Sequence, residues 1–258
     1  MVEPITTKAM KPKNLIYIAI VAAAFTLTSC EKTYEDLSRI TYFPEFTMEG
    51  EAEIIHLLGE PYEDGAVTAT EDGESLEVSE EVTGVWKGYS GSTIDVNEYD
   101  KYEIVYSATN ADGFEGNVIR TVFVAPPTGD LVSSLEGVYL AQVQRTPAFA
   151  VLPQYSNMKY IYIWKTGDNA FELSCALGAY YFIGRDYGLD FAFQGAVITA
   201  NDIPANDFSI SQASSPGFGN VADITDFTVD PVNRVISFTS TADFANGVFH
   251  VQLEQVQY

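Results

Sequence analysis

The sequence predicts an all-β protein with two antiparallel domains in tandem. After residue 30, no segment keeps a helical spacing of apolar residues over three turns. Short runs rich in Val, Ile, Thr, Tyr and Phe instead alternate with Gly, Asn, Asp and Pro about every 8 to 12 residues, which is typical of sandwiches and barrels. Residues 125–130 (APPTGD) are expected to be the linker between the domains, because Pro126 and Pro127 stop a strand and stiffen the chain.

Residues 1–30 are expected to be a lipoprotein signal peptide. Three lysines precede an apolar run, Leu15–Phe25, which is too short to span a bilayer comfortably. Residues 27–30 (LTSC) then have the form of a lipobox, in which Cys30 receives the lipid. Residues 31–39 would be a tether, whose acidic pair is either simply solvated or resembles the export tags of surface lipoproteins in Bacteroidetes-type bacteria. We therefore expect a protein that is anchored to the membrane through its N-terminal lipid and does not span it.

The charge of the chain narrows the classes of partner. Its 258 residues include 13 basic and 36 acidic side chains, which gives a formal net charge of -23. Such a surface repels phosphates, so nucleic acid is excluded as a partner, while neutral and cationic ligands remain open.

Residues 40–124 are expected to form the first domain, with six or seven strands. Tyr102, Ile104 and Tyr106 alternate along one strand, so their side chains share one face, and the sequence ADG then supplies a turn before a return strand. The expected strands are residues 41–46, 52–59, 66–72, 75–79, 82–88, 101–110 and 117–124.

The segment Gly59–Glu74 (GEPYEDGAVTATEDGE), followed by YEIVYSATNADG and RTVFV, resembles the bacterial surface immunoglobulin-like domain. The resemblance covers most of residues 40–124. It implies a β-sandwich that serves as a spacer or adhesion module, and it brings no catalytic residues. The chain departs from the pattern at Glu71-Asp72, where one Asp is usual, and at Asn110 in the last turn.

Residues 131–258 are expected to form the second domain as a meander of eight or nine strands, either a flattened barrel or a sandwich. Pro231 and the pair Asn246-Gly247 mark tight turns between consecutive strands. These eight or nine strands are expected among ten candidate segments, residues 137–145, 159–167, 170–176, 178–184, 189–194, 196–201, 207–212, 223–230, 234–241 and 247–256.

This half, from LEGVY through GAYYFIGRDYG to VQLEQV, resembles the C-terminal domain that follows immunoglobulin-like domains in lipoproteins of Bacteroidetes-type bacteria. Those lipoproteins are often linked with polysaccharide utilisation, but the domain itself has no assigned activity. The resemblance implies an outer-membrane location, with exposure at the cell surface left open.

Catalytic motifs are missing from the sequence. His56 and His250 fall in different domains, each within an apolar strand, and no zinc motif or G-x-S-x-G segment occurs. Cys175 lies in an apolar run and is expected to be a small buried hydrophobe. We therefore expect no enzyme, no catalytic residue, no cofactor and no metal.

The aromatic side chains are the remaining candidates for ligand binding. Residues 178–184 (GAYYFIG) are expected to form a strand joined to residues 189–194 (LDFAFQ) through an RDYG hairpin turn. In residues 159–164 (KYIYIW), the aromatic and isoleucine side chains occupy opposite faces. Leaving such aromatic faces exposed would create an apolar patch larger than monomers usually tolerate. Either the faces are covered, which burial favours, or the patch is functional.

These observations favour a lipid-anchored binding protein of the outer membrane that binds a neutral glycan or assists polysaccharide uptake. Rings would stack on sugar faces and polar groups would bind the hydroxyls. The candidate ligand-binding residues are Trp164, Tyr180, Arg185, Asp186 and Tyr187. The alternative is a structural or assembly lipoprotein that docks a protein partner.

Overall fold

The structure, a computed structural model, describes residues 40–258, of which residues 42–258 form one compact unit. Their regular structure consists of strands and two short 3₁₀ turns, η2 (Pro153–Tyr155) and η3 (Leu189–Phe191). The predicted all-β fold is therefore confirmed. The expected signal peptide, the lipidated Cys30 and the tether lie outside the described residues.

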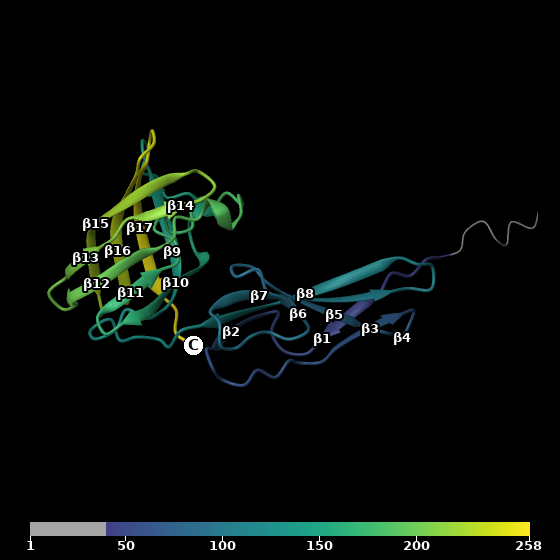
Figure 1. The fold of residues 1–258 in the computed structure, drawn as a ribbon. Helices are drawn as coiled ribbons and strands as arrows, with labels where there is room; N and C mark the ends of the chain where they lie inside the picture. The colour runs from purple at the N-terminus through teal and green to yellow at the C-terminus, as the bar shows by residue number, and fades with distance from the viewer. Residues whose placement is uncertain (1–39) are drawn as a thin grey trace, which may run out of the picture. The chain divides into compact units, whose positions relative to one another are not determined.

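The first half is a sandwich of two sheets (Figure 1). One sheet has the order β1-β3-β4 and the other β2-β8-β7-β5-β6, in which β2 pairs with β8 in parallel. Their bounds are β1 (Glu45–Met48), β2 (Glu53–Leu57), β3 (Val67–Glu71), β4 (Glu74–Leu76), β5 (Ser79–Gly84), β6 (Ser90–Gly91), β7 (Asp100–Thr109) and β8 (Glu115–Ala125).

The hairpin expected around ADG is present as β7 and β8, which pair antiparallel along their whole length. Burial alternates along β7, so that Tyr102, Ile104 and Tyr106 are buried in the core of the sandwich. The two-residue spacing of these side chains is what places them on one face.

The second half is a single curled sheet of nine strands (Figure 1). Its order is β13-β12-β11-β10-β9-β17-β16-β15-β14, so the first and last strands of the domain pair with each other. The two edge strands are joined by only Ser211 and Gln212, which requires the sheet to curl into an incomplete barrel. The strands are β9 (Gly137–Arg145), β10 (Met158–Gly167), β11 (Ala170–Leu173), β12 (Ala196–Asp202), β13 (Asp207–Ile210), β14 (Ala213–Ser215), β15 (Asn220–Asp230), β16 (Val235–Ala242) and β17 (Val248–Gln255).

Residues 174–195 form a long loop between β11 and β12, which we call the buried loop because residues 175–181 are buried, although residues 185–188 are exposed. This corrects the sequence prediction. Neither 178–184 nor 189–194 is a strand, and RDYG is not a hairpin turn. Gly178 has a φ of 58°, and a Cβ there would lie 2.7 Å from a methyl group of Val143, so the loop packs closely on the sheet. An apolar run without alternation fits a buried loop as well as a strand, because period alone does not separate them.

The aromatic face of β10 is covered, as the sequence analysis favoured. Ile161 and Ile163 lie in the core of the second half, whereas Tyr160 and Tyr162 belong to a separate buried cluster with Phe123. The rings of Phe123 and Tyr160 meet edge to face, with centroids 4.7 Å apart. Burial of rings on this scale is worth roughly 1.5 to 3 kcal/mol per large apolar side chain, which explains why the face is not left exposed.

Cys175 is buried in the loop and is a free cysteine, as expected. Burial raises the pKa of its thiol, which leaves it uncharged at neutral pH. It serves as a small apolar side chain.

Candidate functional site

The five predicted ligand-binding residues lie in two places. Tyr180 and Arg185 are in contact on the buried loop and line one surface depression. Tyr187 and Asp186 follow on the same loop and are exposed. Trp164 lies on β10 and lines a different cavity.

The depression that holds Tyr180 and Arg185 has a volume of about 290 Å³, and we call it the arginine depression. It is built from the end of β9, the segment that contains η2, the buried loop and the turn before β17. Its lining residues are Arg145, Thr146, Pro147, Ala148, Ala150, Leu152, Tyr155, Tyr180, Arg185 and Asn246. None of these carries a carboxylate or an imidazole.

Tyr180 is the centre of the aromatic packing beneath the depression. Its ring stacks on that of Tyr155 with a centroid distance of 4.1 Å and meets Phe249 at 5.2 Å. The residue is only 4% exposed, so its ring is not a free platform for stacking a sugar. The structure therefore gives Tyr180 a supporting position, from which its hydroxyl accepts a hydrogen bond from Arg185 (3.4 Å).

Arg145 and Arg185 approach the same ring. Each guanidinium carbon lies 5.5 Å from the centroid of Tyr180, within the range of cation–π attraction. Arg145 also donates from Nε to the carbonyl oxygen of Asn246 (2.8 Å), and Arg185 donates from Nε to the hydroxyl of Tyr155 (3.2 Å). These contacts place both guanidinium groups against the same ring.

The two arginines change the acidity of the tyrosine between them. Burial pushes the pKa of the Tyr180 hydroxyl up, but hydrogen bonds with Tyr155, Arg185 and Arg145 outweigh it, so its pKa is lowered. Hydrogen bonds with Tyr187 and Tyr180 raise the pKa of Arg185, which keeps it charged. The depression is therefore a locally positive site.

Sequence reasoning missed Arg145 and Tyr155. Arg145 is the last residue of the predicted strand 137–145, and Pro147 follows two residues later, so Arg145 lies where the strand ends and a loop begins. A cation at such a boundary was the available signal, because binding residues concentrate on loops that a rigid sheet holds in place.

Tyr187 is 47% exposed. Its ring stacks on Tyr181 with a centroid distance of 5.8 Å and meets Phe191 edge to face at 5.5 Å. Tyr181 itself is buried in the core. Tyr187 thus presents one partly exposed ring on the same loop as the arginine depression.

The cavity at Trp164 has a volume of about 150 Å³. Both tryptophans of the chain line it, since Trp86 joins Trp164, and Tyr99 lies 6.0 Å from Trp164 between ring centroids. Lys87 and Glu172 supply charged groups, and burial raises the pKa of the Glu172 carboxyl. The cavity combines aromatic walls with a few polar groups.

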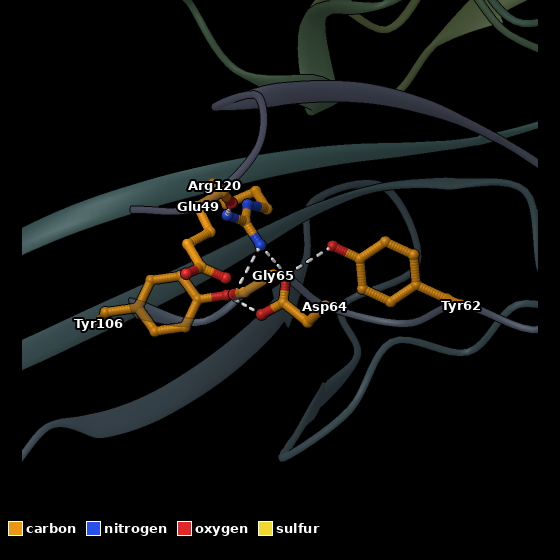
Figure 2. Close-up of polar contacts among 6 residues, drawn as sticks. All are labelled: Glu49, Tyr62, Asp64, Gly65, Tyr106 and Arg120. Atoms are coloured by element: carbon orange, nitrogen blue, oxygen red, sulfur yellow. Dashed lines mark hydrogen bonds and ion pairs between the residues drawn. The ribbon is translucent and has the colours of Figure 1, made fainter. Parts of the chain in front are cut away.

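A second arginine site lies in the immunoglobulin-like half and was not recognised from the sequence (Figure 2). Arg120 is 1% exposed and donates to the carboxylate of Asp64 and to the carbonyl oxygens of Gly65 (3.1 Å) and Glu49. We call this group, with the two tyrosines below, the buried ion pair after its buried arginine, although the Asp64 side chain is 26% exposed.

Two tyrosines complete the buried ion pair. The hydroxyls of Tyr62 (2.8 Å) and Tyr106 both donate to Asp64. Burial together with Asp64 raises the pKa of Tyr62 to about 12 and that of Tyr106 further. Asp64 thus contacts side chains from β7 and β8 as well as Tyr62, so the group joins the segment at residues 62–65 to these two strands and has a structural role.

Other candidate chemistry is sparse in the part of the chain that the structure describes. Across residues 40–258, no group of three or more His, Cys, Asp or Glu side chains could hold a metal ion. His56 contacts the carbonyl oxygen of Glu60 (2.8 Å), and His250 lies on β17 with an exposed side chain. Over the same range, no helix has the length and apolar character needed to cross a membrane.

Known proteins are similar to both halves of the chain. Residues 46–124 match the family model of the bacterial surface protein Ig-like domain. Residues 128–255 match the family model of a C-terminal domain. No curated protein matches the chain significantly. Neither family description names an enzymatic activity.

A solved structure has the same arrangement of elements. The lipoprotein BT2262 from Bacteroides thetaiotaomicron matches with a TM-score of 0.56 and 26% sequence identity, over 83% of this chain and 100% of that chain. The surface-protein domain and the lipoprotein neighbour indicate a location in the cell envelope. The chain is therefore similar to a bacterial lipoprotein of the BT2262 type, and it combines a surface-protein immunoglobulin-like domain with a curled β C-terminal domain.

Proposed function

We propose that this protein is a lipid-anchored glycan-binding protein of the outer membrane that assists polysaccharide uptake. Cys30 would carry the lipid, residues 31–39 would be the tether, and residues 40–124 would hold the C-terminal domain, residues 131–258, away from the bilayer. The linker would be residues 125–130. The glycan site would be the arginine depression, where Tyr180 and Arg185 of the predicted set meet Arg145.

The observation that carries the proposal is an open depression with apolar walls and fixed hydrogen-bond donors. Pro147, Ala148 and Ala150 supply apolar surface, while the arginines supply N–H groups in a planar fork. Its volume is near the lower end of small-molecule sites, which suits a single sugar residue of a longer chain. Asp186 and the ring of Tyr187 on the same loop would contact neighbouring sugar residues.

Binding is a better reading of this site than hydrolysis. Glycoside hydrolysis uses two carboxyl groups on opposite sides of the scissile bond. The lining of the arginine depression contains none. Trp164 lies in its own cavity, and we propose it as a separate glycan contact.

A steric block tests the proposal. Ala150 is exposed and lines the depression, so Ala150→Trp fills it without entering the core. The matched control is Ala205→Trp, at an exposed turn between β12 and β13. Affinity gels across a polysaccharide panel, run with the detergent-solubilised full-length protein, are expected to show a retarded polymer for wild type and the control but not for Ala150→Trp. Absence of binding to the whole panel would overturn the proposal.

A docking site for a protein partner is the second candidate. Val151 and Leu152 are about half exposed on the segment that borders the depression. Exposed apolar residues at the rim of a site favour contact with another protein surface. Pull-down from detergent-solubilised envelopes separates the two functions, because a stable partner lost in Ala150→Trp would favour docking, whereas glycan binding needs no such partner.

A further inference from the structure

The arginine depression differs in charge from the protein around it. The chain as a whole carries -23, and residues 40–258 contain only eight basic side chains. Two of these eight line the depression, and none of its lining residues is acidic. Distant surface charges act weakly here, because physiological salt screens exposed charges over about 8 Å. The local pair of arginines therefore decides which ligand charge is favoured.

Neither arginine forms an ion pair with a carboxylate of residues 40–258. The neighbouring Asp186 is exposed and forms none of these pairs. Both cations line the same depression, so an anion bound there would be attracted by both.

The geometry of Arg145 suits an oxyanion. Its guanidinium lies over the rings of Tyr180, Tyr181, Phe244 and Phe249, at 5.1 to 5.7 Å from their centroids. These rings and the bond from Nε to Asn246 fix the plane of the fork. A fixed guanidinium binds the two oxygens of a carboxylate or sulfate with parallel hydrogen bonds and little loss of side-chain freedom.

Arg185 completes the site from the exposed side. It is held by the hydroxyls of Tyr155 and Tyr180, and it remains in contact with solvent. An incoming oxyanion can therefore reach Arg185 first and then Arg145. The lowered pKa of Tyr180 is consistent with a positive local potential.

We propose that the arginine depression binds an oxyanion substituent of an acidic polysaccharide, either the carboxylate of a uronic acid or a sulfate ester. This inference rests on the proposed glycan-binding function and deepens it. The sequence analysis favoured a neutral glycan as the ligand, and this inference proposes an anionic glycan instead.

The test compares matched charged and neutral ligands by isothermal titration calorimetry on the detergent-solubilised full-length protein. The probes are galacturonate oligosaccharides with their carboxyl-reduced forms, and sulfated galactan oligosaccharides with their desulfated forms. We expect one of the charged forms to bind about tenfold more tightly than its neutral match, because charge-assisted hydrogen bonds replace bonds to water. The charged form that is preferred identifies the oxyanion.

Three variants assign that preference to the arginines. Arg185→Gln and Arg145→Gln are each expected to remove it, and Arg185→Gln keeps the test valid if the more buried Arg145 variant fails to fold. Lys165→Gln makes the same change of charge at an exposed position on β10 and should keep the preference.

Two results would overturn the inference. The first is equal affinity for charged and neutral oligosaccharides, or a charge preference that survives Arg185→Gln. Either would show that the arginines do not select an oxyanion, while the measured glycan binding would still support the proposed function. Absence of binding to every oligosaccharide overturns the proposed function and this inference with it.

Discussion

The two halves of this protein use arginine in opposite ways. In the immunoglobulin-like half, Arg120 is fully buried and donates to Asp64 and to two backbone carbonyl oxygens. In the C-terminal half, Arg145 and Arg185 lie at a surface depression and contact tyrosines instead of carboxylates. The positive charge of Arg120 is paired with a carboxylate of the protein, whereas the positive charges of Arg145 and Arg185 can interact with a ligand.

This difference separates a structural role from a binding role. A buried cation must be paired, because an unpaired charge in a low-dielectric interior costs several kcal/mol. A half-exposed cation that rests on aromatic rings stays solvated and retains hydrogen-bonding capacity for a ligand. We therefore expect the buried ion pair to control stability and the arginine depression to control binding.

The largest expected effect is on stability at the buried ion pair. Asp64→Asn leaves the fully buried Arg120 without its carboxylate and should lower the free energy of unfolding by roughly 3 to 5 kcal/mol. Arg185→Gln, at an exposed position, should change it by about 0.5 kcal/mol or less. Urea unfolding followed by tryptophan fluorescence measures both. Equal effects of the two substitutions would contradict the contrast between the sites.

The next effect concerns the loop that shapes the arginine depression. Gly178→Ala adds a methyl group 2.7 Å from Val143 at a positive φ, so we expect a loss of about 3 kcal/mol together with weaker glycan binding. Gly219 has a similar φ of 68°, but nothing lies within 4 Å of an added Cβ, so Gly219→Ala should cost only about 1 kcal/mol. Thermal unfolding of the pair measures the difference. Similar losses would show that the loop is not tightly packed at Gly178.

The smallest effect is a pH dependence of opposite sign at the two sites. Tyr62 has a folded-state pKa raised to about 12 from an ordinary value of 10.0, so its contribution to stability is complete below pH 10 and is lost as the pH rises toward 12. The pKa of Tyr180 is lowered, so its contribution is present above pH 10 and is lost as the pH falls through its folded value.

Urea unfolding between pH 8 and about pH 12 tests these signs. Tyr62→Phe should lessen the alkaline loss of stability, whereas Tyr180→Phe should deepen it. A change in the same direction for both variants would contradict the assignment of a positive environment to Tyr180.

Local patterns predicted much of the fold. The alternation of Tyr102, Ile104 and Tyr106, with ADG behind them, led to the β7–β8 hairpin, and the turns at Pro231 and Asn246 lie between the predicted strand pairs. Each of these features depends on neighbours within a few residues, where φ preference and side-chain period decide the conformation.

The candidate site was only partly predictable. Tyr180, Arg185 and Tyr187 were singled out because they are close in sequence, and they remain together on the buried loop. Arg145 and Tyr155 were missed because each is at least 25 residues away from that loop's Tyr180 along the chain, so only the folded sheet brings them beside it. Trp164 was grouped with the loop, but it lies in another cavity because β10 has two buried faces.

The sequence by itself determined the all-β class and the strong negative charge, because composition, strand period and turn residues act locally. The tertiary structure alone decided that residues 174–195 form a buried loop, that the aromatic face of β10 is covered and that two arginines meet over Tyr180. These outcomes depend on which surfaces are covered and which distant side chains become neighbours. An apolar run can be buried as a strand or as a loop, and only the packing of the whole chain selects between them.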